Sequence, residues 1–464
     1  MFVTKNILNL AALQDLIKEA RYLFKQSRVI LLQLALMVLS SYGGGLFSTL
    51  VVLGIFIWNL SKNRFQDALI LFLVLLLFSD SNFPLFKNPG KAKDYVALML
   101  AYYIFTKTRS PMSHSFIQRF WPYLGVAFVG LILADFELSK RFLGFQKLAS
   151  YGLLMIIVPA GVNHVFKNKG ALLFLRKLVF VFAALYVFSI LMSRINPGTF
   201  AYLGRLNGIH RNPNGIGIFS ALFIMNLWLI KDKFPHFLSR KLFLSIVGVF
   251  LAAIVLSASR NSMLSLGVFF LFRTVKIKFF VGLVLVIFIA SGYGALTYII
   301  EQFIVTLGLQ EQLRLDTLSY ASGRIYVWEA CWYEIQDRYW IGHGFTYEEW
   351  SKWDQKHYER IPMLIHNYGN IHNSYLTIWL NTGLLGLLSF LLGLIALVVQ
   401  AQKRSPSIAP MFFAALLIGF FESYLVASLN PYTWQIWFGF TLAILNPSIL
   451  KKRIKKRKKS LIKM

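Results

Sequence analysis

Apolar runs follow one another along most of the chain, separated by short polar connections. This pattern is typical of transmembrane helices, which need about 20 apolar residues to cross a bilayer. Several runs are shorter than that and are expected to be half-spans or to continue into their flanks. The pattern predicts an all-α fold, a polytopic membrane helix bundle of about 12–14 transmembrane helices. The runs cover residues 28–42, 45–60, 67–79, 95–106, 120–134, 149–166, 178–193, 214–230, 242–257, 262–272, 279–299, 373–400, 408–428 and 435–449.

The same pattern divides the chain into five regions. Residues 1–27 mix basic and apolar positions with helical spacing, as expected for an amphipathic cytoplasmic segment on the membrane surface. We expect a transmembrane bundle over 28–299, a partly helical periplasmic loop domain over 300–372 and C-terminal transmembrane helices over 373–449. A basic cytoplasmic tail follows over 450–464.

Composition supports the assignment to a membrane protein. Apolar residues make up 57% of the 464 residues and charged residues only 14%, whereas soluble domains are about 45–50% apolar and about 25% charged. The single cysteine, Cys331, excludes a disulfide framework and a cysteine-based metal site.

The net charge of +29 at first suggests a nucleic-acid partner, but its distribution indicates membrane orientation instead. If the N-terminus is inside and the spans alternate, the inner segments hold 32 of the 48 Lys and Arg residues. Cytoplasmic segments of membrane proteins carry this excess of basic residues. We therefore expect cytoplasmic N- and C-termini, membrane lipids as neighbours and no nucleic-acid partner.

Residues 300–372 differ in kind from the other connections. They carry ten of the 19 acidic residues and only six basic ones, and they include five of the 11 tryptophans. Long loops are usually functional or disordered, and disordered segments contain few aromatic residues. We therefore expect an ordered domain on the outer side of the membrane.

Two polar stretches lie at the outer ends of predicted helices. Residues 205–215 end in Asn-Pro-Asn-Gly, a typical turn and helix start; they form either a polar helix cap or a site that uses Arg205, Arg211 and Asn214. The second stretch, Ser-Ala-Ser-Arg-Asn-Ser at 257–262, interrupts an apolar region. An arginine such as Arg260 is costly there unless it faces a cavity, a partner or the headgroups.

Two further stretches contain Arg324 and His372. Ser-Gly-Arg at 322–324 predicts a helix start, where a cation is unfavourable, so Arg324 is expected to face an anion: either a ligand or an acid of the same loop. His372 and Asn373 stand at the mouth of the long run over 373–400. An imidazole accepts a proton near neutral pH. Asn373 either orients this base or binds a sugar, or the pair simply caps the helix.

All four stretches fall on the outer side of the predicted topology. Arginines together with a histidine suit a substrate with an anionic leaving group and an acceptor hydroxyl that loses a proton, because guanidinium binds phosphate oxygens bidentately. A lipid diphosphate joined to a sugar has this chemistry. The chain contains no Walker loop, Rossmann glycine fingerprint or HExxH sequence, so nucleotide-driven transport and zinc proteolysis lose support.

The order of these motifs resembles the bacterial O-antigen ligase and O-antigen polymerase superfamily. The resemblance covers about residues 200–395, and the many-helix layout extends it to the whole chain. The stretches that carry it are His-Arg-Asn-Pro-Asn (210–214), Ser-Arg (259–260), Ser-Gly-Arg…Trp (322–328), Gly-His-Gly-Phe (342–345) and His-Asn-Ser-Tyr-Leu…Gly-Leu-Leu-Gly (372–386).

The resemblance implies an inverting, metal-independent glycosyltransferase without a cofactor, in the bacterial inner membrane, with its active site facing the periplasm. The donor would be an undecaprenyl-diphosphate-linked glycan. His372 would be the base that activates the acceptor hydroxyl, and Arg324 and Arg260 would neutralise the leaving diphosphate. The substrate-binding residues would be Arg211, Arg205, Asn373 and Asn214.

The sequence does not choose between a ligase, whose acceptor is lipid A–core, and a polymerase, whose acceptor is a second lipid-linked glycan. A flippase or transporter of lipid-linked glycan is the alternative without chemistry. Transporters, however, typically place ionisable residues near the midplane of repeated halves, and this chain shows no clear internal repeat. Glu422 is the only acid deep in a late apolar run, where we expect it to be paired. A membrane-anchored binding scaffold would leave the outer arginines and His372 without a role.

Overall fold

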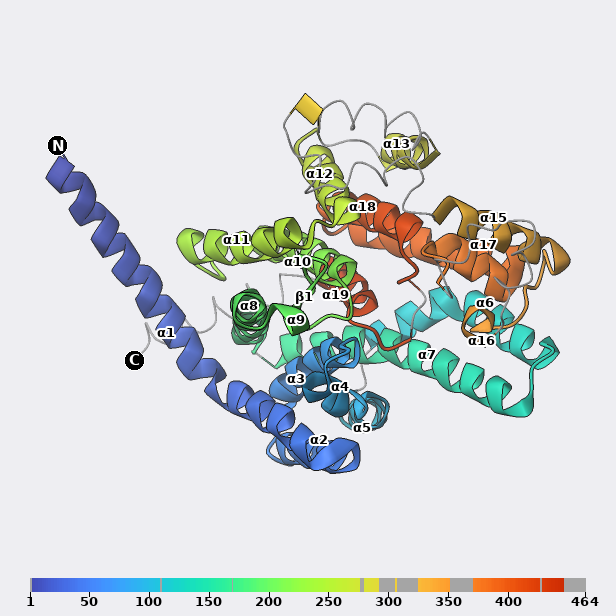
Figure 1. Ribbon diagram of the computed structural model, residues 1–464, viewed down its shortest axis with the longest axis horizontal. Helices are drawn as coiled ribbons and strands as arrows, with labels where there is room; N and C mark the ends of the chain where they lie inside the picture. Colours follow the sequence, from blue (N-terminus) through green and yellow to red (C-terminus); the bar gives the residue numbers. More distant parts are fainter. Residues whose placement is uncertain are drawn as a thin grey trace, which may run out of the picture. The chain divides into compact units, whose positions relative to one another are not determined.

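The described part of the chain is predominantly helical in the computed structural model (Figure 1). The described residues form two compact units: unit 1 comprises residues 1–110, 160–259 and 444–464, and unit 2 comprises residues 111–159 and 260–443. The structure describes residues 2–108, 111–168, 170–275, 279–291, 305–306, 324–350, 370–425 and 428–445.

Unit 1 contains the first five helices and a second group that surrounds a short antiparallel ribbon. Its elements are α1 (Phe2–Ser40), the 3-10 turn η1 (Ser41–Gly43), α2 (Gly44–Ser61), α3 (Phe65–Ser79), α4 (Pro84–Gly90), α5 (Lys93–Lys107), α8 (Ala171–Ile195), α9 (Pro197–Phe200), β1 (Ala201–Tyr202), β2 (Arg205–Leu206), α10 (Pro213–Lys233) and α11 (Arg240–Ser257).

Unit 2 contains the remaining helices, and α7 (Leu138–Lys167) begins in unit 2 and ends in unit 1. The other elements of unit 2 are α6 (Pro111–Leu133), α12 (Arg260–Val275), α13 (Phe279–Ser291), α15 (Arg324–Asp337), α16 (Tyr347–Trp350), α17 (Ser374–Gln402), α18 (Ile408–Phe421) and α19 (Thr433–Ile444).

These helices confirm the predicted all-α membrane bundle, because each of the fourteen apolar runs contains a helix. The helices α3 and α18 are apolar but shorter than a full span. Seven helical segments in the described part of the chain are long and apolar enough to cross a membrane, the first of them covering both α1 and α2: Leu13–Ser61, His114–Leu133, Leu138–Lys167, Ala171–Ile195, Pro213–Lys233, Arg240–Ser257 and Ser374–Gln402.

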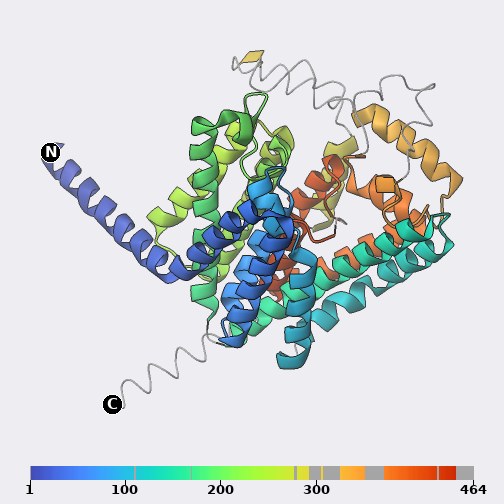
Figure 2. The ribbon, with the colours of Figure 1, turned by 60° about the horizontal axis from the view of Figure 1, so that its bottom comes forward.

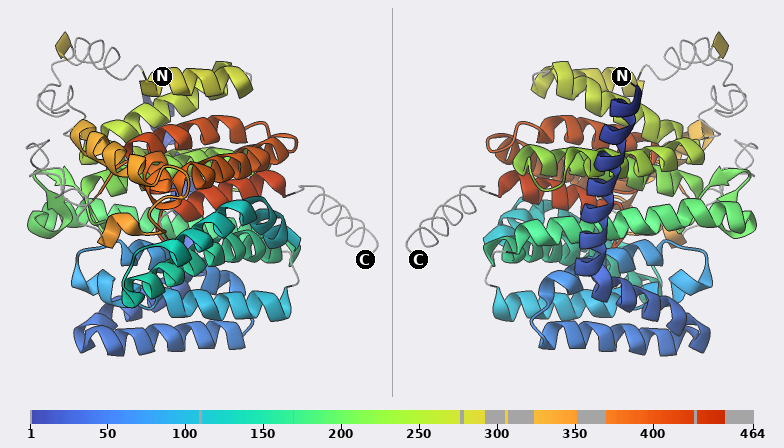
Figure 3. Two further views of the ribbon diagram at one scale, coloured as in Figure 1. Left: turned by 90° about the vertical axis from the view of Figure 1, so that its right-hand side faces the viewer. Right: turned by 90° about the vertical axis from the view of Figure 1, so that its left-hand side faces the viewer.

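The predicted N-terminal segment is helical, and its location on the membrane surface stays a prediction. Helix α1 continues without interruption from Phe2 to Ser40 (Figure 3), so the predicted surface segment and the first apolar run form one helix. The physical reason is that no proline or glycine occurs in this stretch to end the helix between the two. Most of the predicted loop domain over 300–372 and all of the predicted tail over 450–464 lie outside the described residues.

Unit 1 is built around α10, whose side chains are almost all buried. Aromatic rings from three helices meet on this helix. Phe182 of α8 lies 5.3 Å from Phe219 of α10, and Phe223 of α10 lies 4.5 Å from Phe250 of α11, measured between ring centroids. Such pairs stabilise packing beyond their buried area, so α10 forms the core of this unit.

Unit 2 is held together by two pairs of helices: α6 packs along α17, and α12 packs along α18. The part of α7 in this unit lies antiparallel to α6 (Figure 2), with the rings of Phe128 and Phe145 5.3 Å apart. The close approach of α6 to α17 depends on Gly393, where a Cβ atom would lie 2.8 Å from the carbonyl oxygen of Arg119.

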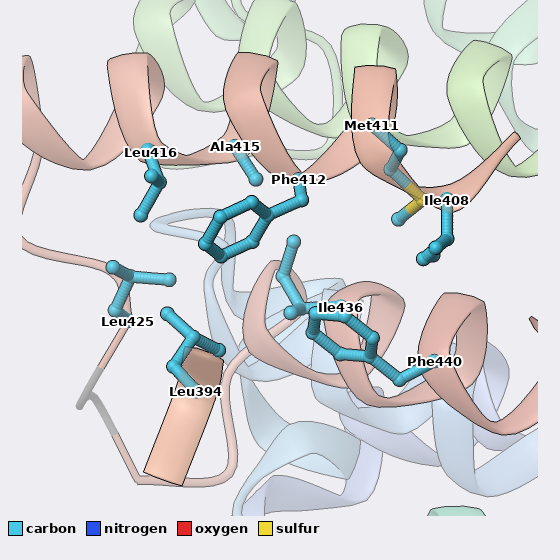
Figure 4. Close-up of a pocket in the computed structure, with 9 residues that line it drawn as sticks. All are labelled: Leu394, Ile408, Met411, Phe412, Ala415, Leu416, Leu425, Ile436 and Phe440. Carbon is cyan, nitrogen blue, oxygen red and sulfur yellow. The ribbon is translucent and has the colours of Figure 1, made fainter. Parts of the chain in front are cut away.

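A small apolar cavity of about 10 Å³ lies among α17, α18 and α19 (Figure 4). Leu394, Phe412, Leu425 and Phe440 contribute to its walls. A cavity of this size holds at most about one water molecule, and a water molecule needs polar partners that these walls do not supply. The cavity therefore belongs to the packed core and is not a substrate site.

Candidate active site

The predicted base, His372, lies at the start of α17. Asn373 caps this helix, because its Oδ1 accepts hydrogen bonds from the N–H groups of Tyr375 (2.9 Å) and Leu376 (3.1 Å). Asn373 is buried. Of the roles that the sequence left open for Asn373, the structure shows the capping of α17. His372 has a φ of +51°, a conformation uncommon for residues other than glycine. The chain therefore turns sharply at His372, immediately before the helix.

The imidazole of His372 contacts Glu422, which follows the end of α18. His372 Nδ1 lies 3.0 Å from Glu422 Oε2, and Arg324 Nη2 lies 2.7 Å from Glu422 Oε1. An ionised carboxylate only accepts hydrogen bonds, so Nδ1 carries the proton and Nε2 keeps the lone pair. The side chain of His372 is 31% exposed and that of Glu422 only 13%. In this arrangement Nε2 of His372 can accept a proton, while Nδ1 is hydrogen-bonded to the mostly buried carboxylate of Glu422.

Arg324, the first residue of α15, donates hydrogen bonds to both the Glu422 carboxylate and the carbonyl oxygen of Phe421. The anion that the sequence predicted for Arg324 is therefore present within the protein, on a residue outside the 300–372 loop. These two bonds use two of the five N–H groups of a guanidinium. Within the described residues, the other three N–H groups have no hydrogen-bond partner.

Glu422 is held in its ionised form. Burial alone would raise its pKa, but the Arg324 guanidinium and the hydrogen bond from His372 outweigh burial and lower the pKa of this carboxyl to about 2. At neutral pH Glu422 therefore carries a full negative charge, and this charge lies beside the imidazole of His372.

This pKa predicts an acid-range change in stability. Because the pKa is about 2 in the folded protein, below the ordinary value of 4.5, ionised Glu422 adds stability above about pH 4.5, and this contribution is lost as the pH falls toward 2. Thermal unfolding of the wild type and of Glu422→Gln should show a constant difference in melting temperature near neutral pH, which shrinks below about pH 4.5. A difference that stayed constant down to pH 2 would contradict the assigned pKa.

The segment after α18 is bonded to the first turn of α17. Ser374 Oγ donates to the Glu422 carbonyl (2.6 Å) and accepts from the Tyr424 N–H (3.1 Å). Ser423 Oγ accepts from the Asn373 N–H (3.0 Å). The sequence predicts an apolar run over 408–428, but its helix, α18, ends at Phe421. These bonds hold the residues after Phe421 at the start of α17 and so prevent them from continuing α18.

Trp328 of α15 positions the residue that precedes His372. Its indole Nε1 donates to the carbonyl oxygen of Ile371 over 2.9 Å, and Ile371 is buried. Arg324 lies one turn earlier on the same helix and contacts Glu422. Arg324 and Trp328 thus place α15 against Glu422 and against the residue that precedes His372.

Helix α17 is interrupted at Gly383, which has a φ of +67°. The loop after α15, here called the inserted loop (residues 339–344), completes the hydrogen bonds at this break. The N–H groups of residues 384 and 385 donate to the carbonyl oxygens of residues 339 and 340 in the inserted loop. The N–H groups of residues 343 and 344, at the end of the loop, donate to the carbonyl oxygens of residues 380 and 381. These four bonds are 2.9–3.2 Å long. All four main-chain groups that the break opens thus have partners, as a membrane environment requires.

The inserted loop depends on close contact between two glycines. A Cβ atom on Gly342, whose φ is +69°, would lie 2.4 Å from the backbone nitrogen of Gly383. Gly342→Ala is therefore expected to lower the free energy of unfolding by roughly 3 kcal/mol, because the loop must leave the break. The measurement is thermal unfolding together with proteolysis of the inserted loop. Gly152→Ala is the matched control, since a Cβ there meets nothing within 4 Å; equal stability of the two variants would contradict the assigned contact.

Arg260 begins α12, which packs along α18. The next residue, Asn261, donates from Nδ2 to the carbonyl oxygen of Ile418 over 3.4 Å, one turn before Glu422. The structure therefore brings the Arg260 end of α12 to the Glu422 end of α18. The N-terminus of a helix of this length also attracts anions.

The other predicted site residues lie in unit 1. Arg205 donates from Nε to the carbonyl oxygen of Ser257 (2.8 Å) and from Nη2 to Asn214 Oδ1 (3.0 Å). Arg205 thereby satisfies the C-terminal end of α11, where carbonyl groups lack helical partners. The predicted helix start at Asn-Pro-Asn-Gly is confirmed, with Asn212 as the cap of α10.

Arg211 is exposed, and its carbonyl oxygen accepts a hydrogen bond from Asn82 over 3.4 Å. The adjacent His210 is buried and uses both ring nitrogens: Nδ1 lies 3.1 Å from Asp80 Oδ2, and Nε2 lies 2.8 Å from the Tyr186 hydroxyl. A histidine with both nitrogens engaged is poorly suited to accept a proton from a substrate. His372, with its Nδ1 bound to a carboxylate and its side chain partly exposed, is better suited.

Sequence reasoning did not place Glu422 in the site, because 50 residues separate it from His372. The available signal was electrostatic: an acid within an apolar run needs a partner, and ionisable residues in such runs are usually functional. The expected pairing of Glu422 is confirmed, with Arg324 and His372 as its partners. Within the described ranges, no three His, Cys, Asp or Glu side chains are grouped as a metal ion would require.

The fold and the site together define a polytopic helical membrane protein with a histidine–carboxylate–arginine cluster at the mouth of a transmembrane helix. Residues 243–391 match the family model described as O-antigen ligase. The match confirms the resemblance to the O-antigen ligase and polymerase superfamily, a group of glycosyltransferases. It includes His372, Arg324 and Arg260, whereas Glu422 lies beyond it. Comparison with curated proteins gives no match.

Proposed function

We propose that the protein transfers a glycan from an undecaprenyl-diphosphate donor to a periplasmic acceptor, with inversion at the anomeric carbon and without a metal ion. The observation that carries the proposal is the contact of His372 and Arg324 with the same Glu422 carboxylate. The family match supports it, because two members of this cluster lie within the matched residues. In this proposal the protein is an inner-membrane protein with cytoplasmic termini, and His372 faces the periplasm.

In the proposed reaction, His372 Nε2 removes the proton from the acceptor hydroxyl as its oxygen attacks the anomeric carbon. A new glycosidic bond forms, the bond between the anomeric carbon and the diphosphate oxygen breaks, and the diphosphate leaves with the bonding electrons. Glu422 stabilises the resulting imidazolium through Nδ1–H. General-base catalysis of this kind typically contributes about 10²- to 10⁴-fold.

The leaving diphosphate gains negative charge, which cations and helix N-termini stabilise. Arg260, the N-terminus of α12 and the remaining N–H groups of Arg324 supply this stabilisation in the proposal. Arg205, Arg211 and Asn214 belong to unit 1, and their contact with substrate remains a prediction. Asn373 acts by capping α17, since its amide oxygen already accepts two main-chain hydrogen bonds.

The test is a reconstituted assay with labelled undecaprenyl-diphosphate-linked glycan. One arm supplies lipid A–core as the acceptor and the other supplies a second lipid-linked glycan; the arm that yields product separates a ligase from a polymerase. Product must form together with free undecaprenyl diphosphate. Movement of the lipid-linked glycan across the bilayer without product in either arm would instead establish a flippase and contradict the proposal.

A further inference from the structure

A groove of about 440 Å³ lies between α1 and α2 in unit 1, and no step of the proposed reaction uses it. Its walls include Val29, Leu32 and Leu36 from α1, and Gly54, Ile55 and Trp58 from α2. Figure 1 shows the C-terminal half of α1 beside α2, and the two helices pack against each other. The volume falls in the range of about 300–1,000 Å³ that is typical of ligand sites.

The groove opens on a surface that fits the hydrocarbon of a bilayer. Leu32 is 68% exposed and Leu36 is 50% exposed, both within a helical segment apolar enough to cross a membrane. Exposed leucines at this density are unfavourable in water but suit contact with lipid chains. The ligand class that reaches this groove is therefore a lipid.

The side chains of α1 indicate where the headgroups lie. Along its exposed stripe, basic residues at 18, 21, 25 and 28 give way to Leu32, Leu36 and Leu39. This change marks the boundary between the headgroup layer and the hydrocarbon. Trp58 lines the groove at its Val29 end, and tryptophan prefers this interface. One end of the groove thus lies at headgroup depth.

A lysine lies beyond the groove-lining residues of each helix, at the headgroup end of the groove. Lys25 lies four residues before Val29 on α1, and Lys62 lies four residues after Trp58 at the end of α2, so each shares a helical face with the wall residues. Both lysines are exposed, and within the described residues neither forms an ion pair. Two cations beside the headgroup end of an apolar groove complement a lipid phosphate.

The wall of the groove is held in place by a polar contact between the helices. Asn59, which is buried, donates from Nδ2 to Gln33 Oε1 over 3.2 Å and to the carbonyl oxygen of Ile55 over 2.9 Å. Gln33 itself lines the groove. Because this bond joins α1 to α2 beside the groove, the groove is formed before any lipid enters.

We propose that this groove binds one acyl chain of an anionic phospholipid, with the phosphate held between Lys25 and Lys62. The site is independent of the glycan-transfer reaction, because it lies wholly in unit 1 and uses none of the residues assigned to the reaction. Phosphatidylglycerol is the probe, and phosphatidylcholine, which has the same acyl chains and no net charge, is the comparison lipid.

The first test fills the groove. Gly54→Leu places an apolar side chain in it, and a Cβ at Gly54 meets no atom within 4 Å, so the backbone does not need to move. Gly248→Leu on α11 is the matched control: this glycine is equally open and exposed but is not among the residues that line this groove. Native mass spectrometry from micelles with equal amounts of the two lipids should show at least about a tenfold loss of retained phosphatidylglycerol for Gly54→Leu, with the control unchanged.

The second test removes the charge. Lys25→Gln and Lys62→Gln should each lower the preference for phosphatidylglycerol over phosphatidylcholine by about fivefold, whereas Lys241→Gln, an exposed lysine of α11, should leave it unchanged. Equal retention by Gly54→Leu and Gly248→Leu would overturn the groove as the site. Equal retention of both lipids by the wild type, or displacement of phosphatidylglycerol by an equimolar isoprenyl diphosphate, would overturn the choice of ligand.

Discussion

Replacement of His372 by alanine is expected to reduce glycan transfer by about 10²- to 10⁴-fold, because the acceptor hydroxyl then loses the group that removes its proton. Donor binding should change little, since the diphosphate is assigned to arginines and to a helix N-terminus. The measurement is single-turnover transfer in liposomes with saturating donor and acceptor. A fall in the rate of transfer with an almost unchanged affinity for the donor is the expected signature.

The matched control for this variant is His114→Ala, on the exposed start of α6 in the same unit. It removes an imidazole of the same size from a helix end without touching the cluster around Glu422. Both variants should insert into membranes and unfold at similar temperatures. Transfer by His372→Ala at the rate of the control would contradict the assignment of His372 as the base.

Replacement of Glu422 by glutamine is expected to lower the rate of transfer by up to about 10⁴-fold, the loss seen when the carboxylate partner of a catalytic histidine becomes an amide. The side chain keeps its size, but its charge no longer stabilises the imidazolium, and its amide can donate a hydrogen bond to Nδ1 and favour the wrong tautomer. Since Glu422 acts through His372, it is a positioning residue, and the rate constant should fall while the KM for the donor stays within a few-fold.

Glu349→Gln is the control for this prediction. Glu349 forms an ion pair with Lys147, and its side chain is 43% exposed, so the loss of its charge should change transfer by less than about a factor of five. Arg324→Ala combined with Glu422→Gln supplies a second check. If the two residues act as one unit, the double variant should be hardly slower than the slower single variant. Fully multiplicative losses would show that Arg324 and Glu422 act separately.

The helices were predictable from the sequence because burial in a bilayer imposes long apolar runs, and every run contains a helix. Two boundaries were not predictable from hydropathy. Helix α1 extends to Phe2 because its polar and basic residues, with no proline or glycine among them, are compatible with a helix. Helix α18 stops at Phe421, within an apolar run, because Glu422 and Ser423 instead contact His372 and Asn373, the two residues before α17. Hydropathy reports the environment of a segment and not its hydrogen-bond partners.

The candidate site was predictable in part for the same reason. His372 and Arg324 stand out because charged or titratable groups near a membrane helix are costly and therefore informative. Glu422 does not stand out as their partner, because no local spacing links residues 50 positions apart. The role of Gly342 also depends on a long-range contact, since its tight fit against Gly383 exists only after the inserted loop meets α17.

The break in α17 has a consequence for how the protein is made. A helix that entered the bilayer alone with this break would expose two carbonyl groups and two N–H groups to hydrocarbon, at a cost of several kcal/mol for each unsatisfied group. The inserted loop precedes α17 in the chain, so the ribosome has already synthesised the loop when α17 reaches the membrane. The hydrogen-bond partners of the break are therefore present at that point. Synthesis from the N-terminus therefore supplies the missing partners in the order in which insertion needs them, and the docking of this loop is a step in membrane integration as well as in the assembly of the site.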